Sequence, residues 1–163
     1  YIGRNLDKES DFRYRNPKNL AKSQVVFFYD LLKESDRIFI VEGPMDAMTL
    51  FDYSVACIMG NRISDPQVQK ILKKNPKQII FIPDYDETVE KRQIIGKALK
   101  KNIESVRKFD SKVEVGVYRW YKKYGEKGKD LNDINHTKIE EDLISMKSFK
   151  GEVLEKLENV EQR

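Results

Sequence analysis

Short apolar runs alternate along the chain with longer stretches in which apolar residues recur at helical spacing. The short runs are unbroken rather than alternating with polar residues, which is typical of strands buried on both faces of a parallel sheet. Four of these runs predict strands, at residues 37–42, 55–59, 78–83 and 112–118.

The intervening stretches predict helices at residues 19–34, 44–53, 65–74 and 87–108. Asp65 is suited to cap the third of these, with Pro66 at its first position. Alternating strands and helices predict an α/β fold, with about four mostly parallel strands and helices on both faces. Residues 1–20 predict a short strand with an extended or hairpin segment, and residues 137–160 predict one or two helices.

Composition indicates the number of domains, the kind of partner and the cellular compartment, but it does not define the activity. The chain has 163 residues, enough for one domain, and its net charge of +4 favours a polyanionic partner. Its one cysteine, Cys57, lies in an apolar run and is expected in the core, so no disulfide can form within the chain. No run of about 20 apolar residues and no signal peptide is found, which favours a bacterial or infected-cell cytoplasm.

Acidic residues follow two of the predicted strands directly. Glu42 and Asp46 come after the first, separated by Gly43, which lets the backbone turn sharply. Asp84 and Asp86 come after the third, and the two-residue period of an extended chain predicts that both carboxylates face one spot. Because ligands of open parallel sheets bind at the carboxyl ends of the strands, we expect these acids to converge.

A third acidic group, Asp130 and Asp133, follows the last predicted strand after a loop rich in Gly and Lys. Taken alone, each group is more often a solvated turn. All three in order, each behind its own strand, favour a shared site for a hard cation such as Mg²⁺ or Mn²⁺.

These groups resemble the Toprim domain. The matching segments are Val41-Glu42-Gly43-x-x-Asp46, Asp84-x-Asp86 and Gly128-Lys129-Asp130-x-Asn132-Asp133. That fold is shared by bacterial and phage primases, type IA and type II topoisomerases, OLD-family nucleases and RecR-like repair proteins. The resemblance covers residues 36–136 and implies a Toprim fold.

The residues before this region are similar to the segment that precedes Toprim in DnaG-type primases. They are Gly3-Arg4, Arg13-Tyr14-Arg15-Asn16-Pro17 and Lys22. Arg13 stands where the family usually has Lys, and Glu87-Thr88 stands where it usually has Ala-Gly, which favours a phage-type member. The resemblance divides the chain into the end of a basic N-terminal subdomain with a connecting helix (1–35), the Toprim domain (36–136) and a C-terminal helical segment (137–163).

The resemblance implies a nucleotidyltransferase that makes short RNA primers from NTPs on a single-stranded DNA template, with a replicative helicase as partner and no membrane association. It implies two or more Mg²⁺ or Mn²⁺ ions. Their ligands are expected to be Glu42, Asp84, Asp86 and Asp130, with Asp46 and Asp133 as outer ligands or orienting groups. The expected contacts to NTP or nucleic acid are Arg4, Arg13, Asn16, Lys22, Arg62 and Lys129.

Several alternatives stay open. The acids also suit a Toprim nuclease or topoisomerase. A non-catalytic module that binds nucleic acid is a further alternative, although the retained acids argue against it, and Glu42 can be a metal ligand or a proton carrier. The basic residues can be ordinary solvated side chains. The aromatic residues Tyr118, Trp120, Tyr121 and Tyr124 can stack on bases, although a place in the core is favoured.

Overall fold

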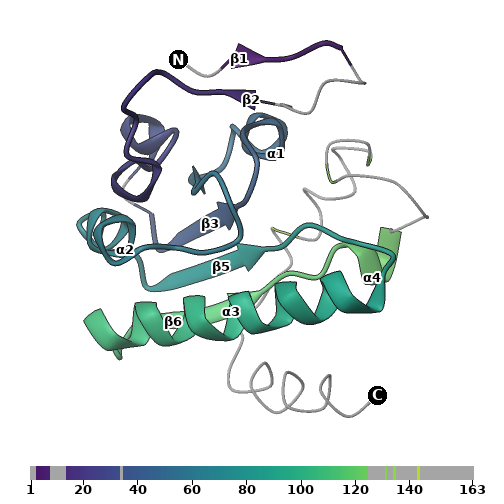
Figure 1. Cartoon of the computed structure of the whole chain (residues 1–163). Coiled ribbons are helices and arrows are strands. Elements are labelled where there is room, and N and C mark those ends of the chain that lie inside the picture. Colours follow the sequence, from purple (N-terminus) through teal and green to yellow (C-terminus); the bar gives the residue numbers. More distant parts are fainter. Residues whose placement is uncertain are drawn as a thin grey trace.

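Four parallel strands form the centre of the computed structural model, which describes residues 3–7, 14–33, 35–124, 131, 134 and 143 (Figure 1). The strands lie in the order β4-β3-β5-β6. Their bounds are Arg37–Val41 for β3, Val55–Cys57 for β4, Gln78–Ile82 for β5 and Glu114–Val117 for β6. All four predicted strands are therefore confirmed, and every pairing between them is parallel.

Both faces of this sheet are covered, as unbroken apolar strands require. Ile38 and Ile40 point to the face on which α2 (Asp65–Leu72) and α3 (Val89–Phe109) pack. Phe39 and Val41 point to the other face, where α1 (Pro44–Thr49) packs. The predicted α/β architecture with helices on both faces is confirmed.

The helix predicted for residues 19–34 is wrong. Two short 3₁₀ turns, η1 (Lys22–Gln24) and η2 (Tyr29–Leu31), are separated by extended chain. In that chain Phe27 exchanges backbone hydrogen bonds of 2.9 and 3.1 Å with Cys57 of β4, and Phe28 has a left-handed φ of 65°. Pairing with a strand edge replaces the local hydrogen bonds that a helix would make, so the spacing of apolar residues misled the prediction.

Helix α2 also begins differently from the prediction. Its cap is Ser64, one residue before Asp65, and the Ser64 hydroxyl accepts a hydrogen bond from the Gln67 backbone N–H. The Gln67 side chain accepts in return from the Ser64 N–H, which completes a capping box. Asp65 instead lies in the first turn and pairs with Lys108 of α3 at 2.7 Å.

The remaining described parts agree with the predictions, except for one short helix that was not predicted. Strands β1 (Gly3–Arg4) and β2 (Tyr14–Arg15) form a small antiparallel pair, as the predicted hairpin requires. A short helix, α4 (Tyr121–Tyr124), follows β6. Trp120 is 1% exposed, and its indole N–H donates to the Pro83 carbonyl at 3.0 Å. Trp120 and the buried Tyr118 therefore belong to the core, as favoured. Within the described part of the chain, no helix has the length and apolarity needed to cross a membrane.

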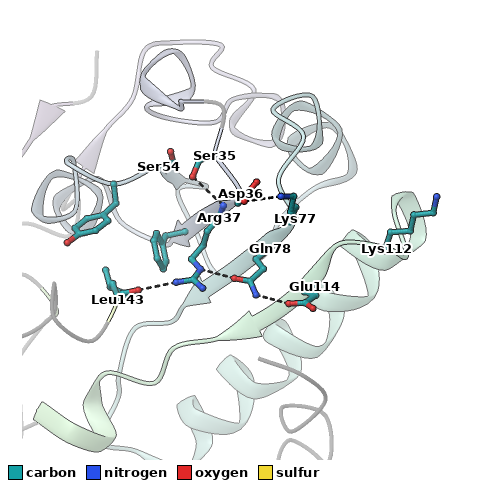
Figure 2. A pocket seen from close by; sticks show the side chains of 11 residues that line it. Ser35, Asp36, Arg37, Ser54, Lys77, Gln78, Lys112, Glu114 and Leu143 are labelled. Atoms are coloured by element: carbon teal, nitrogen blue, oxygen red, sulfur yellow. Dashed lines mark hydrogen bonds and ion pairs between the residues drawn. The ribbon is translucent and has the colours of Figure 1, made fainter. Parts of the chain in front are cut away.

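A polar ladder crosses the sheet where the strands begin (Figure 2). Arg37 of β3 donates to the Gln78 side chain at 2.8 Å, and Gln78 of β5 donates to Glu114 of β6 at 2.6 Å. Arg37 also donates to the backbone carbonyl of Leu143 at 3.0 Å, and the Leu143 side chain is buried against the α1 face. The ladder therefore fixes one point of the C-terminal segment to this edge of the sheet.

Candidate functional site

A pocket of about 230 Å³ lies at the opposite edge, where the strands end. It is lined by Asn16, Lys22, Glu42, Gly43, Pro44, Met59, Gly60 and Asp84. The two acids follow neighbouring strands β3 and β5, and the parallel register brings the ends of these strands together. The expected convergence of Glu42 and Asp84 is therefore present in the structure.

Glu42 is the most perturbed acid of this pocket. Its side chain is half-buried and accepts a 3.4 Å hydrogen bond from the Asp84 backbone N–H, while its own carbonyl accepts from the Gly60 N–H at 3.2 Å. Burial, and next the negative charge of Asp84, raise the pKa of Glu42 to about 7, and Asp46 adds a smaller repulsion. At neutral pH this carboxylate is thus poised between its neutral and charged forms.

Gly43 is required by a close approach rather than by a turn. The chain does bend at Glu42 and Gly43, as expected, but the Gly43 φ of −106° and ψ of 149° are open to any residue, so the bend itself does not need glycine. A Cβ at this position would lie 2.8 Å from Oδ2 of Asp46, which is closer than real Cβ contacts. Glycine therefore lets the Asp46 carboxylate fold back beside Glu42 from the first turn of α1.

We expect Gly43→Ala to move the Asp46 carboxylate away from Glu42. The Asp46 contribution to the repulsion at Glu42 then falls, so the pKa of Glu42 should decrease slightly while the fold is retained. NMR titration of the Glu42 carboxyl measures this shift. Gly96→Ala is the control, because a Cβ there meets nothing within 4 Å. A pKa of Glu42 that is unchanged, or raised, by Gly43→Ala would contradict this account.

Asp86 does not join the other acids in this structure. Strand β5 ends at Ile82, and Asp86, unlike Asp84, does not line the pocket. Its carboxylate accepts from the Thr88 N–H and hydroxyl at 2.9 and 2.7 Å, and pairs with Lys91 at 3.0 Å. These contacts at the start of α3 lower the pKa of Asp86 to about 2, the Thr88 N–H first among them. The expectation that Asp84 and Asp86 face one spot is not met.

The basic residues of the predicted site divide into two groups. Asn16, just after β2, and Lys22, at the start of η1, line the pocket with Glu42 and Asp84. Arg4 and Arg62 are exposed and do not line it. The other predicted residues lie outside the described part of the chain: Arg13, Lys129, Asp130 and Asp133.

Two contributors were missed by the sequence analysis. Met59 lines the pocket with a left-handed φ of 57°, and nothing in its surroundings in the sequence indicates that conformation. Gln67 is 1% exposed, and its amide donates to carbonyls of Lys22, Val25 and Ile58. In the sequence, Gln67 lies one residue before Val68 and four residues before Ile71. This helical spacing was a signal that Gln67 lies on the buried face of α2.

The acids present fit a cation only in part. Among the described residues, no group of three His, Cys, Asp or Glu side chains is close enough to hold a metal ion. Glu42 and Asp84 nevertheless repel each other across the pocket, and a cation between them would relieve that repulsion. Cys57 is no alternative ligand or nucleophile, because burial raises the pKa of its thiol to about 12.

A larger pocket, of about 700 Å³, lies at the edge where the strands begin (Figure 2). Four of its charged groups are already engaged: Lys77 pairs with Asp36 at 3.0 Å, and Arg37 and Glu114 are both hydrogen-bonded to Gln78. None of the residues predicted for the site lines this larger pocket, whereas Asn16, Lys22, Glu42 and Asp84 line the carboxyl-edge pocket, which we therefore take as the candidate site.

Neither the models of known protein families nor the curated protein sequences contain a match to this chain.

Proposed function

We propose that the chain is the Toprim-type catalytic core of a primase, which joins ribonucleotides into short RNA primers on a single-stranded DNA template. The observation that carries the proposal is the pocket that holds Asn16, Lys22, Glu42 and Asp84. These residues come from two separate motifs, the basic lead-in and the acidic strand ends. A shared pocket is what nucleotide polymerisation needs from them, because the triphosphate must meet both cationic and metal-binding groups.

The four parallel strands and the helices on both faces support the fold part of this proposal, since they suit a Toprim domain. We propose Glu42 and Asp84 as the residues that hold Mg²⁺ or Mn²⁺, with Asp46 behind them as an orienting group. Such ions, when bound, activate the attacking hydroxyl and neutralise charge on the phosphates. Asp86 could join them only after it releases Thr88 and Lys91.

The chain's own residues have distinct tasks in this scheme. Lys22 is exposed at the rim of the pocket, where its ammonium neutralises part of the triphosphate charge. Asn16 is half-buried there and can hydrogen-bond to sugar or phosphate oxygens without adding charge. Glu42, with its pKa of about 7, is ionised only as the pH rises to neutrality or above, so its capacity to bind a cation grows with pH.

Primer synthesis tests the proposal directly. The purified chain is incubated with a single-stranded DNA template, labelled NTPs and Mg²⁺ or Mn²⁺, and the products are resolved by length. We expect short RNA whose sequence follows the template, and its loss in Asp84→Asn. Cleavage of the template without RNA synthesis would contradict the polymerase proposal and favour a Toprim nuclease.

Lys22→Gln should weaken NTP binding more than it slows the chemical step. The variant removes one cation from the rim of the pocket, so we expect KM for NTP to rise by about tenfold, with a smaller change in kcat. Initial rates of primer synthesis at varied NTP concentration measure both constants. Lys18→Gln is the matched control, because Lys18 is an exposed lysine of the same segment that does not line the pocket. Equal KM values for the two variants would remove Lys22 from the site.

A further inference from the structure

Positive charge is concentrated on one helix. Between Val89 and Phe109, α3 carries seven Lys and Arg residues against two Glu, a net charge of +5. The whole chain has a net charge of +4, so the other 142 residues together carry −1. The basic balance of the protein is therefore a property of α3.

The Lys and Arg residues of α3 lie on its solvent-exposed face. Its opposite face is buried against the sheet through Leu99, Ile103 and Val106, which fixes the rotation of the helix. Three of its seven cations are engaged nearby: Lys91 with Asp86, Arg92 with the Asp86 and Glu87 carbonyls, and Lys108 with Asp65. The other four are exposed and make no side-chain hydrogen bond or ion pair with the described residues: Lys97, Lys100, Lys101 and Arg107.

These four cations form a row along the molecule, with one exposed acid, Glu104, on the same face between Lys101 and Arg107. From Lys97 to Arg107 the helix rises roughly 15 Å, at about 1.5 Å per residue. Figure 1 shows that α3 starts at the edge where the strands end and runs back along the sheet. The cations therefore extend from this edge towards the edge where the strands begin, on the outside of the fold.

We propose that this face of α3 binds the sugar–phosphate backbone of a nucleic-acid duplex. The only aromatic residue in α3 is Phe109, at its end, half-buried beneath the Lys108 ammonium. The exposed row therefore has no side chain on which unpaired bases could stack, the usual means of holding a single strand. A duplex instead offers about one negative charge per 1.7 Å of axis at regular positions, which complements a fixed row of cations.

This surface goes beyond the proposed chemistry. In a primase, the duplex would be the primer paired with its template as it leaves the active site. Binding by α3 nevertheless requires no NTP, no metal and no ionised Glu42. The two proposals can therefore fail separately.

The test compares two triple variants of the whole chain in binding to a fluorescent DNA duplex, with EDTA and without NTP. One variant is Lys97→Gln, Lys100→Gln and Lys101→Gln. Its control is Lys33→Gln, Lys73→Gln and Lys112→Gln, three exposed lysines that lie close before strands β3, β5 and β6, away from the middle of α3. Both variants should fold, because all six side chains are solvent-exposed. Circular dichroism spectra of the two variants check this.

We expect the α3 variant to bind the duplex about tenfold more weakly at 50 mM salt, while the control binds nearly as wild type. Each lost phosphate contact should reduce the slope of log K against log salt by about 0.9, so the α3 variant should lose between 2 and 3. Asp84→Asn should bind like wild type, even if primer synthesis is absent. Equal losses in both triple variants would overturn the proposal. A loss confined to single strands, or displacement seen only with an acidic polypeptide such as polyglutamate, would overturn it equally.

Discussion

Glu42→Gln is expected to make the protein more stable at pH 8 while it removes activity. In the folded protein the pKa of Glu42 is raised from 4.5 to about 7 by burial and by Asp84. A carboxyl with a raised pKa costs nothing below pH 4.5, where it is protonated in both the folded and unfolded states. The cost grows between pH 4.5 and 7 and is complete above pH 7, where it amounts to about 3 kcal/mol. Gln cannot ionise, so the variant avoids this cost.

Urea unfolding at pH 4 and pH 8 measures the difference. We expect wild type and Glu42→Gln to have similar free energies of unfolding at pH 4, with the variant more stable at pH 8. Millimolar Mg²⁺ or Mn²⁺ should then stabilise wild type at pH 8 and leave the variant nearly unchanged, because the cation offsets the ionised carboxylate. Primer synthesis by the variant should fall at least about a hundredfold.

Glu87→Gln is the control for Glu42→Gln, because Glu87 is an exposed acid close to the same edge. It should change neither stability nor cation response. A Glu42→Gln variant that is less stable than wild type at pH 8 would contradict the account of Glu42 as a repelled, half-buried carboxylate. Stabilisation by Mg²⁺ that survives in Glu42→Gln would remove Glu42 from the proposed cation site.

Gln67→Ala should destabilise the protein more than the other single changes proposed near the pocket. The Gln67 amide donates to the Val25 carbonyl at 2.7 Å and to the Lys22 and Ile58 carbonyls at 3.1 and 3.2 Å. Its removal leaves buried carbonyls without that donor, which costs about 2–4 kcal/mol. Thermal unfolding should show a decrease in Tm of about 5–15 °C.

The same change should also disturb the pocket. Gln67 holds the backbone on both sides of η1, where Lys22 lies at the pocket rim, so its loss lets the lead-in move relative to Glu42. We expect KM for NTP to rise in Gln67→Ala even at temperatures where the variant is fully folded. Gln69→Ala is the control, because Gln69 is exposed on the same helix. Equal Tm values for the two variants would show that the buried amide contributes little.

The strands were predictable because their signal is local. Residues of β5 such as Ile79, Ile80 and Phe81 are buried on alternating faces, so apolar side chains are needed at every position. The predicted helix at 19–34 failed because its alternative conformation depends on distant partners. The backbone bridge to Cys57 and the Gln67 amide lie 30 or more residues further along the chain, and no local pattern encodes them.

The site was predictable to the extent that it depends on strand ends. Glu42 and Asp84 meet because β3 and β5 pair in parallel register, which follows from the order of elements. Asp86 was predicted wrongly because it lies four residues beyond the end of β5, where contacts with Thr88 and Lys91 at the start of α3 hold its carboxylate. Only the family resemblance predicted that Lys22 belongs to the site. No local pattern could predict it, because the Lys22 backbone is held in place by the side chain of Gln67, 45 residues away.

The contact between Arg37 and the Leu143 carbonyl has a consequence for how this fold can be joined to other domains. It holds the chain, after the last strand, at the edge where the strands begin, opposite the carboxylate pocket. A fluorescent protein or a surface tether joined directly after Leu143 would therefore start at the edge opposite the pocket. Single-molecule measurements that immobilise the protein at this point should leave the pocket facing the solution.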